Sequence, residues 1–414
     1  MAAACLAMEA VTASQAEAWK EDLHFLAKEM VRVHPNLFHA VSREQFDAAV
    51  AELEGRIPLL TRDDIIVGMA KLVALIGEGH TQMGLASNGD PKIGFGRYPL
   101  SLYLYADGLF VRAASPELTQ VVGGRVLRIG RMSVSEAIEA VRPIIHRENE
   151  MTFKDVLPSR LVIPEVLHSL GVCEEREACA YEIESVTGRR STVRLEALPF
   201  GKEPAWVRAN DASRRPLPLY LRHRDKNFWF EDLPRQHSIY VQYNVVFNSD
   251  DETVEHFFDR VFDFIADHPV DRMILDLRLN NGGDNTLNAP LVLHLRNCKK
   301  VNRRGHLFVI IGRLTFSAGM NCAMDLEKNT EAIFVGEPTE SSPNQYGDPT
   351  RIVLPQSGIG VSVSTRYWED GGPSDHRPWL APRVPAVLTS KDYRENRDPA
   401  MNAIAAFREK NPRP

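Results

Sequence analysis

The sequence predicts a multi-domain α/β protein, and two observations support that fold class. A chain of 414 residues exceeds the size at which one hydrophobic core keeps growing, so several packed units are expected. The apolar pattern also changes along the chain, from helical period to short alternating segments and then to alternating strands and helices. We expect a helical domain over residues 1–90, a small α+β module over 91–203, a linker over 204–218, an α/β core over 219–400, and a C-terminal helix or tail over 401–414.

The N-terminal domain is expected to be a helical bundle over residues 19–86. Apolar residues from Leu23 to Val33 recur at three- and four-residue steps, which places them on one helix face. Ser42, three residues before Gln45, predicts a capping box at the start of a second helix.

A third predicted helix starts at Thr61 and runs into two glycines. Gly77 and Gly79 are expected to end it, because glycine adopts the left-handed conformation that terminates helices. This arrangement presents His80 in a turn.

The middle module and the core are expected to be built on strands. Alternating segments predict strands at 100–105, 109–112, 124–129, 181–185 and 191–195, with a helix at 134–141. The prolines and arginines of 204–218 are typical of a linker. The core is expected to contain strands at 238–243, 273–277, 307–311 and 332–335 and an amphipathic helix at 251–267.

Composition excludes several classes of function. The net charge is -6, and no basic stripe with interleaved aromatic residues is present, so no nucleic acid partner is expected. No apolar run reaches the length of a membrane span, so no membrane-spanning helix is expected. The opening residues 1–16 lack a basic region and contain Glu9, which indicates a frayed start, with a trimmed export signal as the alternative.

The cysteines suggest neither a disulfide framework nor a zinc site. Their number is odd, they are scattered, and no two have the C-x-x-C spacing. Reduced thiols and a cytoplasmic location are therefore expected, with export as the alternative. The five are Cys5, Cys173, Cys179, Cys298 and Cys322.

Two glycine-containing segments have the pattern of a catalytic site. Gly282 and Gly283 follow a predicted strand, where backbone N–H groups could face an anion, although a plain glycine turn fits equally well. Ser317 lies between a predicted strand and the small residues that begin a helix. Taken alone, Ser317 fits an N-cap serine better than a nucleophile.

The remaining histidines and the known cofactor motifs add no second site. His34, His39, His146, His168, His223 and His237 lie in helices or loops without a glycine-rich presentation, where a structural role is the default. Paired metal-ligand spacings and the dinucleotide fingerprint are absent, so no metal and no cofactor are expected.

The order of these motifs resembles the tail-specific (carboxyl-terminal processing) protease family. The likeness spans nearly the whole chain, from the G-E-G-H-T stretch through D-L-R-x-N-x-G-G to T-F-S-A-G and the closing Asp398-Pro399. It implies an N-terminal helical bundle that supplies a catalytic histidine, a degenerate PDZ-like module and a Clp/crotonase-like α/β protease core. It also implies a peptide or protein substrate and leaves a homo-oligomer open.

The family has two catalytic designs, and the sequence distinguishes between them. The processing-peptidase branch uses a lysine in G-x-x-T-x-G-K-G, but the corresponding residues 336–347 contain no lysine. The tricorn-like branch takes a histidine from the N-terminal part, and His80 matches that position. Ser317 is then the expected nucleophile and His80 the expected base, by resemblance and by elimination.

The resemblance also implies the remaining members of the site. Asp375 matches the position of the acidic member, with Glu369 and Asp370 as competitors. The oxyanion hole is expected from the backbone N–H groups of Gly282 or Gly283 and Ala318. Two departures from the tricorn-like pattern are Gly79 in place of a serine and Arg383 after Pro382, in place of the aspartate of the pattern's closing P-D.

The expected function is hydrolysis of peptide bonds through an acyl-enzyme. The main alternative is a non-catalytic binding protein of the same fold that holds an apolar ligand or a peptide, because fold does not determine function. A crotonase-like acyl-CoA enzyme is a weaker alternative, since it would need neither the helical start nor the PDZ-like module.

Overall fold

A mixed six-stranded sheet forms the C-terminal half of the protein, which a computed structural model describes from residue 9 to residue 408. Its strand order is β18-β13-β12-β11-β10-β9. The first five strands of this order are parallel to one another, and β9 is an antiparallel edge strand. The strands are β9 (Phe228–Leu233), β10 (Ser238–Tyr243), β11 (Arg272–Asp276), β12 (Leu307–Ile311), β13 (Ile333–Gly336) and β18 (Val384–Pro385). The four core strands predicted from the sequence are confirmed.

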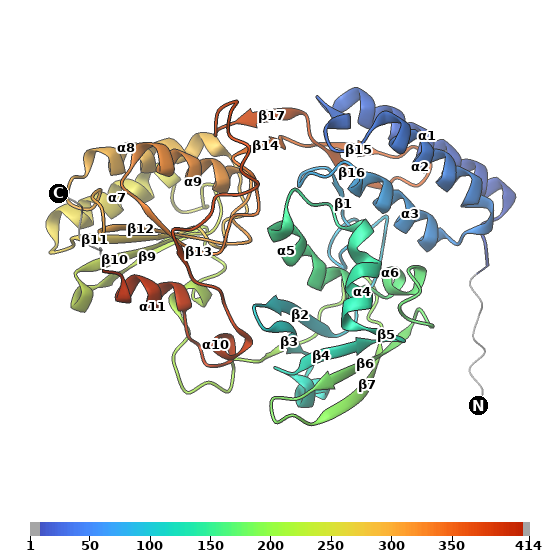
Figure 1. Cartoon of the computed structure of the whole chain (residues 1–414), viewed down its shortest axis with the longest axis horizontal. Helices are drawn as coiled ribbons and strands as arrows, with labels where there is room; N and C mark the ends of the chain where they lie inside the picture. Colours follow the sequence, from blue (N-terminus) through green and yellow to red (C-terminus); the bar gives the residue numbers. More distant parts are fainter. Residues whose placement is uncertain (1–8, 409–414) are drawn as a thin grey trace.

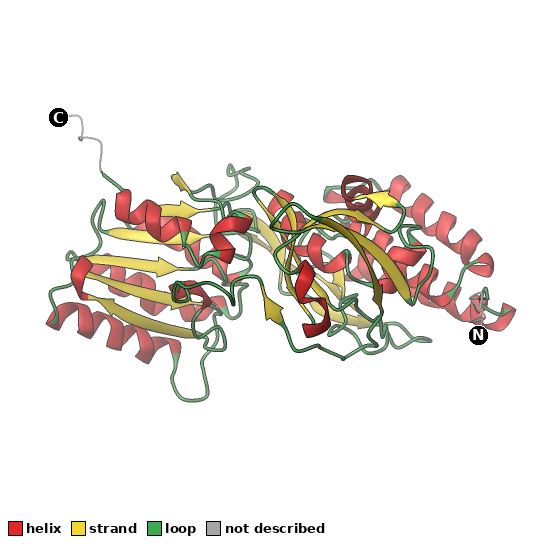
Figure 2. Ribbon diagram, turned by 90° about the horizontal axis from the view of Figure 1, so that it is seen from below, coloured by secondary structure: helices red, strands yellow, loops and turns green. Residues whose placement is uncertain are grey.

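Helices cover both faces of this sheet (Figure 2). Alternate residues along each strand point to opposite faces, so Val309 packs under α7, α8 and α9 while Phe308 packs against α11. The helices are α7 (Val254–Asp267), α8 (Ala289–Asn297), α9 (Ala318–Asn329) and α11 (Pro399–Ala406), and the short α10 (Ser390–Arg394) precedes α11. The predicted amphipathic helix at 251–267 is confirmed as α7.

A second, antiparallel sheet occupies the middle of the chain. Its order is β2-β3-β4-β6-β7, with β5 beside β4 and β8 beside β3. The strands are β2 (Leu100–Tyr105), β3 (Gly108–Ala114), β4 (Arg125–Ile129), β5 (Met132–Ser133), β6 (Ala178–Glu184), β7 (Arg190–Glu196) and β8 (Val207–Arg208). The accompanying helices are α4 (Val134–Val141), α5 (Glu150–Arg160) and α6 (Pro164–Ser169).

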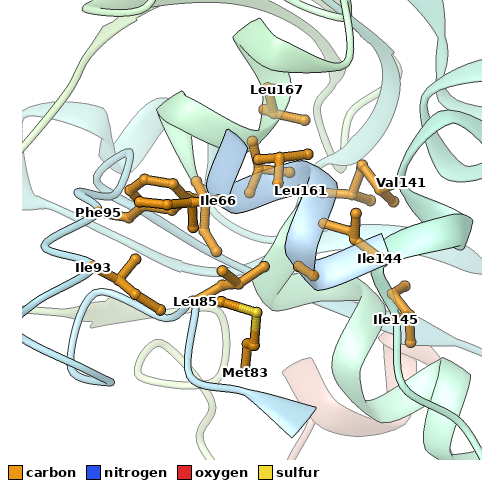
Figure 3. Close-up of a cluster of buried hydrophobic side chains, with 14 of the residues drawn as sticks. Ile66, Met83, Leu85, Ile93, Phe95, Val141, Ile144, Ile145, Leu161 and Leu167 are labelled. Carbon is orange, nitrogen blue, oxygen red and sulfur yellow. The ribbon is translucent and has the colours of Figure 1, made fainter. Parts of the chain in front are cut away.

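The N-terminal helices share one hydrophobic core with this antiparallel sheet. They are α1 (Ala13–Val33), α2 (Arg43–Arg56) and α3 (Arg62–Ala74). The predicted capping boxes at Ser42 and Thr61 are present. Figure 3 shows Ile66 of α3 packed among Val141, Ile144 and Leu161 from the middle of the chain. The expected boundary at residue 90 therefore runs through a continuous core.

Two strands of the C-terminal half, β15 and β16, cross to the N-terminal lobe. Strand β1 (Gln82–Met83) pairs with β16 (Gly360–Val363), which pairs with β15 (Thr350–Val353). The ribbon of β14 (Asn344–Gly347) and β17 (Arg366–Glu369) lies between the two lobes in Figure 1. Residues 350–363 thus pack outside the 219–400 core in which the sequence placed them.

Several other expectations differ from the structure at the ends of elements. The helical start ends with α3 at Ala74, so the predicted extension to residue 86 is wrong. The 204–218 segment is irregular, as expected of a linker, except that β8 joins the antiparallel sheet. The expected frayed start is wrong for residues 13–16, which begin α1 behind the capping box of Thr12 and Gln15, while residues 1–8 and 409–414 lie outside the described residues.

The expectation of reduced thiols is wrong for one cysteine pair. Cys173 and Cys179 form a disulfide with 5.6 Å between their Cα atoms. Their sequence separation of 6 matches no metal or redox motif, so only the folded path between α6 and β6 brings them together. Cys298 and Cys322 are free, and Cys5 lies outside the described residues. Within residues 9–408, no helix is both long and apolar enough to span a bilayer.

Candidate active site

The residues singled out by the sequence meet in a cleft at the carboxyl ends of β11 and β12. Loops after these strands contribute the glycine pair and Ser317, and the loop between α3 and β1 contributes His80. The cleft has a volume of about 290 Å³. Its rim also includes Asp284, Asn321, Gln345, Asp348, Arg366 and Trp368. Carboxyl ends of parallel strands are the usual place for ligand sites in α/β sheets.

Ser317 has the backbone of a presented nucleophile and not that of a helix cap. It precedes α9 with φ 52° and ψ −125°, a conformation that is rare for residues other than glycine. Its side chain makes no capping hydrogen bond. Its N–H donates to Ser341 Oγ at 3.2 Å, and its carbonyl accepts from Gln345 Nε2 at 3.4 Å. These contacts hold the strained residue so that its hydroxyl faces the cleft.

The hydroxyl of Ser317 is within hydrogen-bond distance of the imidazole of His80. The distance from Oγ to Nε2 is 3.0 Å, which is the reach required of a nucleophile and its base. His80 is only 7% exposed, and its ring stacks on Phe316. A Cβ on Gly79 would lie 2.6 Å from Cε2 of Phe316, so a larger residue at position 79 would force the Phe316 ring to move.

The glycine pair and the start of α9 surround Ser317 with backbone N–H groups. Gly282 has φ 109°, and a Cβ there would lie 2.6 Å from the Cβ of Ser317. The N–H of Gly282, however, donates to Asn280 Oδ1 at 3.0 Å and is already occupied. Among the described residues, the N–H groups of Gly283 and Ala318 have no such partner. They are the donors available to an oxyanion.

A buried carboxylate stands beside the imidazole, and it is Glu78. Its Oε2 accepts the backbone N–H of His80 at 2.5 Å, and its Oε1 accepts the hydroxyl of Ser364 at 2.8 Å. It is 2% exposed. Burial raises the pKa of Glu78, but interactions with His34 and Thr81 and the charge of His80 outweigh it, so the pKa is lowered overall. Glu78 therefore carries a negative charge next to His80.

Burial decides the protonation of His80. Desolvation lowers its pKa below the ordinary histidine value, although the charge of Glu78, the backbone of Tyr346 and the charge of Asp348 each act to raise it. Its Nδ1 is enclosed and makes no hydrogen bond of good geometry with any described residue. A neutral imidazole, which can accept a proton, is the result.

The structure does not bring Asp375 to His80. Its carboxylate accepts hydrogen bonds from the backbone N–H and the guanidinium of Arg377, the shortest at 2.7 Å. These bonds hold the pKa of Asp375 below its usual range. Arg377 also binds Glu327 at 2.8 Å. Asp375 fixes this arginine, and Glu78 occupies the neighbourhood of His80 instead.

Other charged groups near the serine are also engaged elsewhere. Asp370 contacts the Asn321 amide through its carboxylate and the Lys328 ammonium through its backbone carbonyl. The Lys328 ammonium is therefore bound to Asp370 and not to Ser317. Glu369 pairs through its backbone with Asn344 in the β14–β17 ribbon.

Sequence reasoning missed four residues of the site: Glu78, Phe316, Ser341 and Gln345. Glu78 and Phe316 are the direct neighbours of the Gly79-His80 and Ser317 motifs, so adjacency was a usable signal. Ser341 and Gln345 lie in a loop whose path depends on the ribbon, and no sequence pattern marks them.

Comparison with known proteins identifies the fold. No protein-family model matches the sequence, and no curated protein matches it either. Mature CPAF complexed with lactacystin superposes with a TM-score of 0.68 at 12% identity, over 95% of this chain and 98% of that chain. Mature CPAF alone superposes with a TM-score of 0.67 at 12% identity, over 95% of this chain and 96% of that chain. The tricorn protease gives 0.41 at 15% identity, over 94% of this chain and 36% of that chain, which is too loose to argue from.

The likeness to CPAF extends over both lobes, so the multi-domain α/β fold predicted from the sequence is confirmed. At 12% identity the likeness establishes the fold alone. What the site does has to be argued from its geometry.

Proposed function

We propose that this protein is a serine peptidase in which Ser317 is the nucleophile and His80 the general base. The observation that carries the proposal is the 3.0 Å contact between Ser317 Oγ and His80 Nε2, made by a serine with a strained backbone and no capping role. A backbone strained at a reactive group is typical of functional sites.

The geometry supports acyl transfer to the serine. The substrate carbonyl would lie between Ser317 Oγ and the N–H groups of Gly283 and Ala318. His80 would take the hydroxyl proton as Oγ attacks the carbonyl carbon, and it would return that proton to the leaving amine as the peptide bond breaks. Water would then hydrolyse the acyl-serine by the same route. Loss of an oxyanion donor costs about 10²–10³ in kcat.

Glu78 is proposed to support the base electrostatically. It makes no hydrogen bond to the imidazole ring, so it does not set the tautomer as the acid of a conventional triad does. Its buried charge favours the imidazolium that forms during attack, and its bond to the His80 N–H fixes the loop. We therefore assign to Glu78 the supporting role that the family resemblance implied for Asp375.

The finer descriptions of the lobes belong to the same proposal. The antiparallel sheet with α4 and α5 is proposed to be the PDZ-like module, and the parallel sheet with α7, α8 and α9 the Clp/crotonase-like core. The fold shared with CPAF covers 95% of the chain and so includes both sheets.

The main alternative is a binding protein of the same fold that holds an apolar ligand or a peptide. Such a protein has no need of a strained Ser317 beside a neutral imidazole. The cleft is also rimmed by charged and amide side chains, which disfavours an apolar ligand.

Labelling with a fluorophosphonate probe tests the proposal. We expect rapid labelling of the wild type, none of Ser317→Ala, and labelling slowed by at least about 100-fold in His80→Ala, because base catalysis contributes about 10²–10⁴. Ser342→Ala is the matched control, since its hydroxyl binds the Pro378 carbonyl at 3.0 Å. Labelling that persists in Ser317→Ala would contradict the assignment. Mass spectrometry of a peptide library digested by the wild type and by Ser317→Ala tests peptide hydrolysis itself.

A further inference from the structure

The two members of the proposed catalytic pair come from different lobes. His80 follows α3, whose apolar side chains share one hydrophobic core with those of α5. Ser317 precedes α9, which packs in the separate core of the parallel sheet. The 3.0 Å between Ser317 Oγ and His80 Nε2 therefore depends on how the two lobes are joined. One such join, close to the serine, is made by the start of α5.

Asn149 is the N-cap residue of α5 and uses both ends of its side-chain amide. Its Oδ1 accepts the backbone N–H groups of Met151 and Thr152, at 2.7 and 3.3 Å. Its Nδ2 donates across the lobe boundary to the backbone carbonyls of Glu340 and Pro378, at 2.6 and 2.7 Å. An amide nitrogen has two hydrogens, and these two short bonds use both. Asn149 is 8% exposed, so the bonds are shielded from water.

The loop that Asn149 holds is bonded on its other side to the nucleophile. The N–H of Glu340 donates to the Thr315 carbonyl at 3.0 Å. Ser341 Oγ accepts the N–H of Ser317 at 3.2 Å. The carbonyl held by Asn149 therefore belongs to the residue next to the one that supports Ser317.

Glu148, the residue before Asn149, lies between the loops that carry the pair. Its Oε1 accepts the N–H of Ser342, in the loop that supports the serine, at 2.8 Å. Its Oε2 lies 3.5 Å from the position that a Cβ on Gly79 would take, and Gly79 directly precedes His80. The start of α5 thus contacts both sides of the catalytic pair.

We infer that Asn149 is a positioning residue, which holds the loop 339–342 beside Ser317 and so sets the distance between Ser317 and His80. The inference rests on the proposed function of that pair. Asn149 is not among the residues that line the cleft, so it acts through the loop and not by touching the substrate. A displacement of about 1 Å at a reacting group can cost about 10²-fold in rate. Loss of the two donated bonds should therefore lower kcat and leave KM nearly unchanged.

Two substitutions separate this role from helix capping. Asn149→Asp is nearly isosteric and keeps the cap, since aspartate caps helices as well as asparagine does, but it turns an oxygen toward the Glu340 and Pro378 carbonyls. Asn149→Ser also keeps a cap acceptor and removes both donors without adding a charge. In both variants we expect the rate of fluorophosphonate labelling and kcat on one peptide substrate to fall at least about tenfold, with KM within about twofold.

Ser133→Ala is the matched control. Ser133 caps α4 in the same lobe through a capping box, so its loss should lower Tm without disturbing the loop 339–342. All rates are measured well below the Tm of each variant, where every chain is folded. Ser133→Ala should then be labelled as fast as the wild type.

The possible failures are distinguishable. A wild type that is labelled while Asn149→Ser is labelled equally fast would overturn the inference and leave the proposed function intact. An equal loss in Ser133→Ala, or a raised KM at unchanged kcat, would also overturn it. A wild type that is not labelled would refute the proposed function, and this inference with it. Should Asn149→Asp not fold, Asn149→Ser decides the question, because it buries no new charge.

Discussion

The imidazole of His80 lies face to face with the ring of Phe316, with 4.3 Å between centroids and 24° between planes. Phe316 directly precedes Ser317 in the chain. Its side chain therefore supports the base, His80, while its backbone is joined to the nucleophile, Ser317. A Cβ on Gly79 would collide with the same ring. Phe316 therefore helps to position both catalytic candidates, together with the contacts of Ser341 and Glu78.

We predict that Phe316→Leu lowers kcat about tenfold with little change in KM, because an aromatic pair contributes about 0.5–1.5 kcal/mol and its loss frees the imidazole. Phe316→Tyr keeps the ring and should retain kcat within about twofold, since its stacking energy is similar. Steady-state kinetics on one peptide substrate measure both. Equal kcat values in Phe316→Leu and the wild type would show that the stacking does not position His80.

The acidic limb of the pH profile should lie below the ordinary histidine value of about 6.5, since burial lowers the pKa of His80. Only neutral imidazole accepts the serine proton, so kcat/KM rises as His80 deprotonates. Glu78 favours the charged ring; Glu78→Gln should therefore move the limb to still lower pH while lowering kcat. Profiles of kcat/KM between pH 4 and 9 measure the position of the acidic limb. An acidic limb that lies at higher pH in Glu78→Gln than in the wild type would refute the role of Glu78.

Asp375→Asn provides the contrasting variant. Because Asp375 binds Arg377 and not His80, its loss should leave the acidic limb in place and kcat within about twofold. The partly exposed pair should contribute only about 0–1 kcal/mol to the free energy of unfolding. A shift of the limb in Asp375→Asn would restore the aspartate to the site, and denaturant unfolding separates that effect from a loss of stability.

Local patterns predicted the elements of the fold well. The strand 307–311 was predicted at its exact bounds because a run of apolar residues between turn signals marks a buried strand. The capping box at Ser42 was predicted because its hydrogen bonds are local. Ser317 and His80 were paired through the family resemblance and because residues 336–347 contain no lysine.

Long-range packing was beyond the sequence. Residues 350–363 leave the core to pair with β1 because their apolar side chains, such as Ile352 and Val361, complete the N-terminal core. No local pattern shows which core a strand will join. Asp375 was placed by the family resemblance, and a resemblance cannot show that Arg377 binds its carboxylate. The Cys173–Cys179 bond likewise depends on how the chain returns from α6 to β6.

Glu148 is a second buried carboxyl close to the site. Its Oε1 accepts the N–H of Ser342 at 2.8 Å. The residue as a whole is half-buried, but its Oε2 is enclosed and has no partner among the described residues. That oxygen lies 3.5 Å from the position a Cβ on Gly79 would take. Burial raises the pKa of Glu148 to about 8, so the group is mainly protonated at pH 7.

Protonation of Glu148 makes stability depend on pH. The unfolded chain loses this proton near the ordinary pKa of 4.5, whereas burial keeps it on the folded protein up to about pH 8. Between these values the folded state holds more protons, so its free energy of unfolding falls as pH rises. Glu148→Gln does not titrate; its advantage over the wild type should grow from near zero at pH 4.5 to on the order of 1–4 kcal/mol at pH 8. Urea denaturation at pH 5, 6.5 and 8 measures this, with the exposed Glu150→Gln as control. An advantage that is constant with pH would mean that Glu148 is ionised in the folded protein.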